Sequence, residues 1–162
     1  MTTPEELLEF LVSLGIRTKT YQRAPVFTVE ESKRLRGDLP GGHCKSLFLR
    51  DKKRQLFLVV ALEHRKIDLK SLRRSLGAHK NLSFGSPELM MEALGVAPGA
   101  VTPFAVINDT ERRVQVVLDR AMLDVDLLNY HPLENDRTTA IAPGDLLRFL
   151  EASDHAPRLL EF

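Results

Sequence analysis

The sequence predicts an α/β domain in which helices flank a central mixed β-sheet. Apolar residues repeat at helical spacing behind capping residues in several segments, and short apolar runs bounded by turn residues lie between them. The chain has 162 residues, of which 43% are hydrophobic and 28% are charged. This length and composition fit a single globular domain over residues 1–162, with a core of ordinary size.

Helix starts are marked by capping residues. Thr3-Pro4-Glu5-Glu6 forms a capping box ahead of leucines at helical spacing, and Gly15 can end that helix. A second capping box begins at Thr28, and Asp68 and Ser86 can cap two further helices. Helices are therefore predicted over residues 3–15, 28–36, 68–77, 86–95 and 143–151.

Strand signals alternate with these helices. Strands are predicted over residues 18–22, 45–50, 55–61, 104–108 and 114–119. The polar residues Asp51 to Arg54 suit a hairpin connection between the second and third strands. Loops are expected over 37–42 and within 129–139, and no internal repeat or low-complexity tract interrupts the pattern.

The net charge of +1 conceals an asymmetry. The segment 33–80 contains 14 lysines and arginines against 4 acidic residues, so it carries +10 and the remainder of the chain carries −9. Such a block can form a basic face. It can equally be a set of solvated surface charges with partners in the acidic remainder.

The sequence lacks the motifs of several common enzyme classes and metal sites. The sequence has no G-x-S-x-G, Walker A, G-x-G-x-x-G or H-E-x-x-H pattern, and a lone cysteine excludes an internal disulfide or a zinc site built from a cysteine pair. Cys44 follows His43, but neighbours on a strand point to opposite faces, which disfavours a Cys–His nucleophile. We therefore expect no metal and no cofactor, and an activated water as nucleophile if the protein is an enzyme.

The chain shows no targeting or membrane signal. Its start lacks the basic residues and apolar run of a signal peptide, and no stretch approaches the roughly 20 apolar residues of a membrane span. We expect a cytoplasmic protein that does not associate with membranes.

Two segments place glycines beside candidate functional residues. In 41–49, Lys45 follows a glycine pair at the mouth of an apolar strand. In 95–104, Pro98-Gly99 suits a tight turn where glycine can adopt positive φ, and Pro103 keeps Thr102 extended, so that backbone amides can face a substrate oxygen. Alone, these segments also fit a surface lysine and an ordinary helix-to-strand connection.

A third segment, 129–138, contains His131 in a polar loop whose histidine can simply bond to backbone. In their order and separation, the three segments resemble the YbaK/ProX-like superfamily, the free-standing relatives of the editing domain inserted in bacterial prolyl-tRNA synthetases. The alanyl-tRNA(Pro) deacylase branch is the most similar. In this family a lysine before an L-F-L strand, a G-x-x-x-P loop and a downstream histidine form the site. Here these are Lys45, the loop from Gly99 to Pro103, and His131.

The resemblance covers nearly the whole chain and implies a fold, a substrate and a mechanism. The implied fold is that of the prolyl-tRNA synthetase editing domain. The implied reaction is deacylation of Ala-tRNA(Pro), in which the ribose hydroxyl beside the ester helps to activate water. Lys45 would hold the terminal phosphate or the carbonyl region, amides from Gly99 onward would stabilise the oxyanion, and His131 would orient substrate or loop.

The resemblance also implies residues that contact the substrate. Phe27 and Val29 would wall the amino-acid pocket, and Ser46 replaces the family's usual asparagine, which alters the substrate contacts expected there. The remaining expected contacts come from the glycine loop: Ala100, Val101, Thr102 and Pro103.

The basic block would contact phosphates of the acceptor stem through Lys66, Lys70, Arg73, Arg74 and Lys80, which gives affinity without reading sequence. The expected partners are tRNA(Pro) charged with alanine and, transiently, prolyl-tRNA synthetase; no DNA binding is expected.

Three alternatives stay open at this point. The chain could deacylate Cys-tRNA(Pro) or another small aminoacyl-tRNA with the same fold. It could bind RNA through the basic face without catalysis, or be an interaction domain whose charges are ordinary surface.

Overall fold

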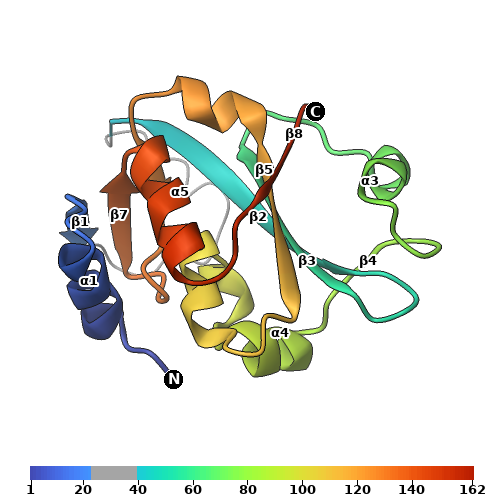
Figure 1. Cartoon of the computed structure of the whole chain (residues 1–162), viewed down its shortest axis with the longest axis horizontal. Coiled ribbons are helices and arrows are strands. Elements are labelled where there is room, and N and C mark those ends of the chain that lie inside the picture. Colours follow the sequence, from blue (N-terminus) through green and yellow to red (C-terminus); the bar gives the residue numbers. More distant parts are fainter. Residues whose placement is uncertain (23–39) are drawn as a thin grey trace.

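In a computed structural model, which describes residues 1–22 and 40–162, helices flank a mixed β-sheet (Figure 1). Within that part of the chain the strand order is β1-β7-β6-β2-β3-β5-β8, and β4 pairs with β2 outside this path. The strands are β1 (Lys19–Gln22), β2 (Gly42–Arg50), β3 (Leu56–Leu62), β4 (Ser83–Phe84), β5 (Val114–Asp119), β6 (Leu128–Tyr130), β7 (Arg137–Ile141) and β8 (Arg158–Leu160). The predicted fold class is therefore confirmed.

Strand β2 joins the two halves of the sheet. Its first residues run parallel to β6, with Gly42 opposite Leu128 and His43 opposite Asn129. From Cys44 onward it pairs antiparallel with β3, and its last two residues also pair with β4. The start of β2 thus lies beside β6 and the loop that follows it.

Helices begin and end where their capping residues predict. Helix α1 (Pro4–Ser13) starts with a complete capping box between Thr3 and Glu6. Helices α3 (Leu69–Leu76) and α4 (Pro87–Leu94) are capped by the side chains of Asp68 and Ser86 and end at left-handed glycines. The last helix is α5 (Pro143–Ala152).

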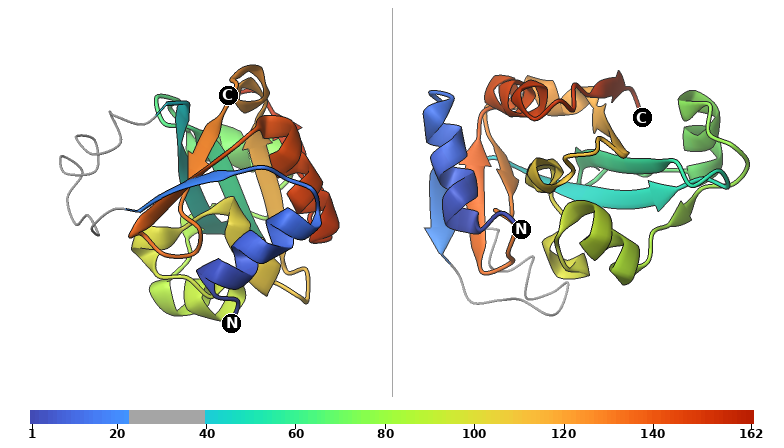
Figure 2. Two further views of the ribbon diagram at one scale, coloured as in Figure 1. Left: turned by 90° about the vertical axis from the view of Figure 1, so that its left-hand side faces the viewer. Right: turned by 60° about the horizontal axis from the view of Figure 1, so that its bottom comes forward.

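Successive side chains of the central strands point to opposite faces of the sheet and belong to two apolar clusters. Phe48, Leu58 and Val60 belong to a large cluster that also holds residues of α1, α4 and α5. Their neighbours Leu49 and Val59 belong to a smaller cluster with Leu72 of α3. Helix α3 lies at the opposite end of the molecule from α1 and β1 (Figure 2, right).

The strand predicted over 104–108 is wrong. This segment is a 3-10 helix, η2 (Pro103–Asn108), whose start is capped by the Thr102 hydroxyl accepting a hydrogen bond from Phe104 N at 3.2 Å. Phe104, Ala105 and Val106 are buried in succession, without the alternation of a half-exposed strand. A short apolar run does not distinguish the two structures when the tertiary core covers all of it.

Other predicted boundaries shift. Strand β2 begins at Gly42, within the predicted loop 37–42, and the predicted loop 129–139 contributes its ends to β6 and β7. Strands β4 and β8 were not predicted because each is only two or three residues long. The predicted helix over 28–36 lies outside the described residues. None of the described helices is long and apolar enough to cross a bilayer.

Candidate active site

Lys45 lies in the middle of β2 opposite Ala61 and is half-buried. Its Nζ donates a hydrogen bond to the backbone oxygen of Arg65, in the turn after β3. By strand alternation Lys45 shares a face with Leu47 and Leu49, the face that α3 covers. A lysine ammonium has three protons, so one carbonyl leaves donors for a ligand.

A buried carboxylate holds the turn that contacts Lys45. Asp119, at the end of β5, is completely buried and pairs with Arg65, with 3.1 Å between Arg65 Nε and Asp119 Oδ2. Its other contacts are the backbone amides of Leu62, at 3.4 Å, and Ala121, at 3.1 Å. Asp119 was not among the predicted site residues, although an acidic residue that closes an otherwise apolar strand is a signal in the sequence.

The glycine loop forms a short 3-10 turn, η1 (Pro98–Ala100), with Gly99 exposed and Ala100 buried. Gly99 does not adopt positive φ, so the predicted conformational reason for a glycine here is wrong. The Ala100 amide donates to Ala97 O and is unavailable to a ligand, whereas the Gly99 amide has no hydrogen-bond partner within the described residues. Thr102 and Pro103 are buried and shape the loop from beneath.

His131 follows β6 and is half-buried, with its Nδ1 2.9 Å from the backbone oxygen of Arg137. Because a carbonyl oxygen only accepts, Nδ1 donates this hydrogen bond, which leaves Nε2 as the ring nitrogen that can meet a ligand. Arg137 is itself held by ion pairs to Glu5, at 3.0 Å, and to Glu134 and Asp136, at longer range. The histidine thus lies in an ordered loop.

The structure brings two of the three predicted segments together. A Cβ placed on Gly99 would lie 3.4 Å from Asn135 Nδ2, so the glycine loop touches the loop that contains His131. Lys45 is near this pair along the backbone: His43 pairs with Asn129, and Lys45 and His131 each lie two residues further along their parallel chains. Its side chain nevertheless contacts Arg65 rather than either loop.

The start of β2 is fixed by a polar clamp. The buried Asn129 donates through Nδ2 to Pro40 O at 2.9 Å and to Gly42 O at 3.3 Å. Gly41 adopts φ +100°, and a Cβ there would lie 3.0 Å from Asn129 Nδ2 and from two atoms of Leu127. Only glycine fits this approach, which explains Gly41, the first glycine of the pair before Lys45.

The Cys–His alternative receives no support from the geometry. Burial raises the pKa of the Cys44 thiol to about 11, so the nucleophilic thiolate is scarce near neutral pH. Cys44 packs with the large apolar cluster. Of the other predicted substrate contacts, Ser46 and Val101 are half-buried, and Phe27 and Val29 lie outside the described residues.

The predicted RNA-binding residues line one end of the molecule. Lys66, Lys70, Arg74 and Lys80 are exposed, and Arg73 is half-buried with a buried Nε that has no partner. Within the described part of the chain none of them forms an ion pair with a carboxylate.

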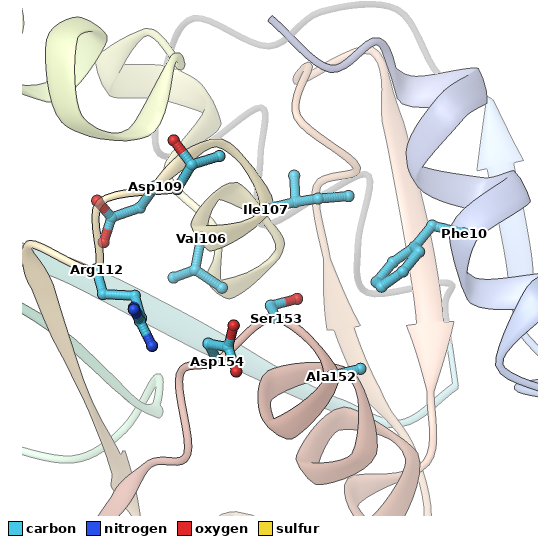
Figure 3. A pocket seen from close by; sticks show the side chains of 9 residues that line it. Phe10, Val106, Ile107, Asp109, Arg112, Ala152, Ser153 and Asp154 are labelled. Carbon is cyan, nitrogen blue, oxygen red and sulfur yellow. The ribbon is translucent and has the colours of Figure 1, made fainter.

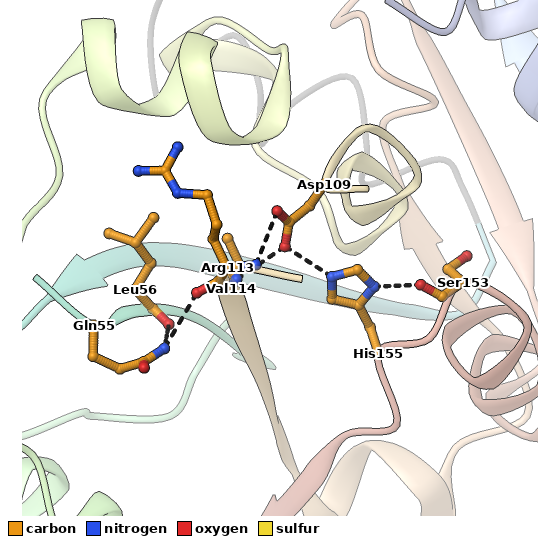
Figure 4. A network of polar contacts seen from close by, with 7 residues as sticks. All are labelled: Gln55, Leu56, Asp109, Arg113, Val114, Ser153 and His155. Carbon is orange, nitrogen blue, oxygen red and sulfur yellow. Dashed lines mark hydrogen bonds and ion pairs between the residues drawn. The ribbon is translucent and has the colours of Figure 1, made fainter. Parts of the chain in front are cut away.

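A separate pocket of about 280 Å³ opens between η2, the turn before β5 and the end of α5 (Figure 3). Its lining includes Phe10, Ile107 and Arg112, and none of the predicted site residues. Beside it, the buried pair His155–Asp109, 2.8 Å apart, connects the segment after α5 to the start of β5 (Figure 4). The pocket adjoins η2, which begins at Pro103, but neither the pocket lining nor the His155–Asp109 pair includes a predicted site residue.

The fold and the two adjoining loops define a class of protein, an aminoacyl-tRNA editing domain. Residues 23–149 match the family model of that description, and the chain belongs to this family.

Its relatives include "Prolyl-tRNA synthetase associated domain-containing protein 1" of Danio rerio, 44% identical over 98% of this chain and 86% of that protein. "Prolyl-tRNA editing protein ProX" of Acetoanaerobium sticklandii is 34% identical over 99% of this chain and 98% of that protein. A solved structure described as "a putative trans-editing enzyme for prolyl tRNA synthetase" superposes with a TM-score of 0.74 at 19% identity, covering 99% and 97% of the two chains. This similarity confirms the fold.

Proposed function

We propose that this chain is a cytoplasmic hydrolase that deacylates Ala-tRNA(Pro), releasing alanine and tRNA(Pro). The observation that carries the proposal is the exposed Gly99 amide, which has no hydrogen-bond partner within residues 1–22 and 40–162 and lies in a loop that touches the His131 loop. An amide donor in a loop that adjoins the loop of a histidine can help to stabilise and orient an ester that water attacks. Family membership and the printed names of the relatives support a tRNA ester as substrate.

The proposed reaction is ester hydrolysis without metal or cofactor. Water, oriented with help from the ribose hydroxyl beside the ester, adds to the carbonyl carbon, and the Gly99 amide donates to the oxyanion. The bond between the carbonyl carbon and the ribose oxygen then breaks, and that oxygen takes a proton. His131 holds the substrate and the loop through Nε2 and its fixed Nδ1 contact.

Lys45 has a different part in this proposal. Its ammonium lies on the side of the sheet that α3 covers, together with the basic residues of that helix. We infer that Lys45 binds the terminal phosphate rather than the carbonyl. The basic residues Lys66, Lys70, Arg73, Arg74 and Lys80 continue the same contact along the acceptor stem.

Size exclusion gives the proposed selectivity. A synthetase site that admits proline rejects the smaller alanine poorly, because one missing methylene changes binding by only ~1–3 kcal/mol. A second, smaller pocket makes the opposite selection. We propose that Phe27, Val29 and the loop from Gly99 to Pro103 wall this pocket, and that Val29→Ala raises activity on larger amino acids relative to alanine.

The test is release of free amino acid from tRNA(Pro) charged with alanine, cysteine, serine or proline. We expect alanine to be released fastest and proline to be retained. Comparable rates of release from Ala-tRNA(Pro) and Pro-tRNA(Pro) would contradict the proposed editing function, since such an enzyme would destroy the correctly charged tRNA. Faster release of cysteine would reassign the substrate, and binding without release of any amino acid would identify an RNA-binding module.

The same assay tests Lys45. Lys45→Ala should lower kcat/KM for Ala-tRNA(Pro) by roughly 10²-fold, as expected when one strong donor is removed. Its circular dichroism and unfolding midpoint should stay near those of the wild type, because the side chain makes a single hydrogen bond to a backbone oxygen. Full activity in the folded variant would remove Lys45 from the site.

A further inference from the structure

The tip of the β2–β3 hairpin carries a dense set of unpaired cations. Arg50, Lys52, Lys53 and Arg54 occupy four of the five positions from 50 to 54, and all four are exposed. Among the described residues none of them forms an ion pair. Their charge therefore faces solvent without internal compensation.

The one acidic residue of the tip organises its backbone. Asp51 is 7% exposed, and its carboxylate accepts hydrogen bonds from the backbone amides of Lys53 and Gln55, both at 2.9 Å, and of His79 at 3.0 Å. Lys52 N in turn donates to His79 O at 3.0 Å. These bonds attach the hairpin to the connection between α3 and β4, which adds Lys80 to the same surface.

We define the basic tip as Arg50, Lys52, Lys53, Arg54 and Lys80. It encloses a hollow of about 160 Å³ lined by three of these cations together with Asp51 and Ser83. Since the Asp51 oxygens already accept three amide protons, the groups left to meet a ligand are two guanidinium groups, an ammonium and a hydroxyl. This set suits an oxyanion such as a phosphate group.

Two residues of the basic tip occupy backbone conformations that favour glycine. Arg54 adopts φ +65° and Lys80 adopts φ +57°, both in the left-handed region. At both positions a charged residue occupies a backbone conformation in which glycine would be more stable. Retaining a charged side chain at such a position is expected if that side chain contacts a ligand.

The position of the basic tip relates it to the proposed substrate. The hairpin, β4 and α3 lie on the same side of the molecule, away from α1 and β1 (Figure 1). Arg50 is five residues beyond Lys45 on the same strand, or roughly 17 Å at about 3.4 Å per residue. That span corresponds to roughly five stacked nucleotide steps.

We propose that the basic tip binds the phosphate backbone of the tRNA stem, as a second contact beyond the end that carries the amino acid. The inference rests on the proposed function only in taking tRNA as the substrate. Residues 50–54 contain no apolar side chain, and by strand alternation Ser83 of the hollow points to the opposite face of β4 from the exposed Phe84, so a phosphate backbone fits better than a lipid surface.

Lys52→Ala/Arg54→Gly is the informative variant, because glycine accepts the positive φ of position 54 and the Lys52 side chain is exposed, so the fold should persist. We expect uncharged tRNA to bind the double variant several-fold more weakly at moderate salt. The slope of log K against log salt should fall in magnitude by about 1.5, for two lost phosphate contacts. Arg17→Ala, an exposed cation between α1 and β1, is the single-charge control and should change neither quantity.

A kinetic comparison locates the contact. The double variant should raise KM for an alanyl acceptor-stem microhelix and leave kcat unchanged, and its hydrolysis of a short alanyl-trinucleotide ester should equal that of the wild type. The proposal would be overturned if the double variant kept the wild-type tRNA affinity and salt slope, or if Arg17→Ala lost as much tRNA affinity as the double variant. It would also be overturned if the double variant bound tRNA normally but no longer bound phosphatidylserine vesicles.

Absence of deacylation on every substrate, with tRNA binding still dependent on the basic tip, would refute the proposed reaction and leave this contact standing.

Discussion

At the scale of single residues, the candidate site contains two glycines that are required for different reasons. Gly99 has ordinary φ, and among the described residues its amide has no hydrogen-bond partner and a Cβ placed on it would approach Asn135 Nδ2 at 3.4 Å. Gly41 has φ +100° and three atoms at 3.0 Å from the place of a Cβ. In the proposed reaction the first would supply a donor and space for a substrate, whereas the fold requires the second.

The matched variants Gly99→Ala and Gly41→Ala separate these reasons. Gly99→Ala should keep the unfolding midpoint and tRNA affinity, and lower deacylation because a methyl group occupies the space beside the ester. Gly41→Ala should destabilise the protein by more than about 1 kcal/mol, the cost of the left-handed conformation alone. Urea unfolding and single-turnover deacylation are the two measurements. Equal destabilisation by both would contradict the distinction.

Asp119 acts at the same scale, as the buried partner of the turn that holds Lys45. Asp119→Ala should lower the free energy of unfolding by about 3 kcal/mol, because it leaves the Arg65 guanidinium and two amides without their acceptor. We also expect a lower kcat for the fraction that remains folded. Asp119→Asn, which keeps an acceptor oxygen, should be milder in urea unfolding. Equal loss in the two variants would show that the negative charge is required, and a wild-type free energy of unfolding for Asp119→Ala would contradict the role of this residue.

At the scale of elements, the β2–β3 hairpin depends on Asp51. Burial alone would raise the pKa of this carboxyl, but the hydrogen bonds from the amides of His79, Gln55 and Lys53 outweigh burial and lower the pKa below its ordinary value of 3.8. The ionised carboxylate therefore stabilises the folded state above about pH 4, and this contribution is lost as the pH falls through the lowered value.

Asp51→Ala should cost about 2–3 kcal/mol at pH 7, for three lost hydrogen bonds in a partly exposed turn. The difference from wild type should shrink as the pH is lowered below 4, because the wild-type carboxyl is then protonated. Urea unfolding of both proteins between pH 3 and pH 7 measures this. A difference that stays constant over that range would show that Asp51 contributes through packing rather than charge.

At the scale of the whole molecule, one buried pair fastens the C-terminal segment to the sheet. His155 Nε2 lies 2.8 Å from Asp109 Oδ2, and His155 Nδ1 faces the backbone oxygen of Ser153. Asp109 also accepts from the amides of Arg113 and Val114 at the start of β5. Both ring nitrogens therefore face oxygen atoms within the buried segment.

His155→Ala should lower the free energy of unfolding by about 3–5 kcal/mol, the usual cost of removing one partner from a buried pair. Hydrogen exchange should show the loss spread over α5, β5 and β8, because the pair links all three. Deacylation at low temperature should persist, since this pair lies outside the candidate site. Loss of activity without loss of stability would place the pair in the reaction instead.

The sequence by itself determined the helices, because their caps are local: the Thr3–Glu6 box, Asp68, Ser86 and the glycines after α3 and α4 act within a few residues. It also determined the family, through the spaced segments around Lys45, Gly99 and His131. Only the tertiary structure decided that residues 104–108 coil rather than extend, because burial on all sides removes the alternation that would mark a strand.

Contacts between distant segments were likewise decided by the fold. Asp119 contacts Arg65, and the Gly99 loop contacts Asn135. These residues are far apart in the sequence, so local sequence patterns do not predict the contacts. The basic tip arises in the same way, when a carboxylate at position 51 binds an amide at position 79 and draws the cations of two segments onto one surface. Sequence patterns describe neighbours along the chain, whereas charge and chemistry at a site depend on neighbours in space.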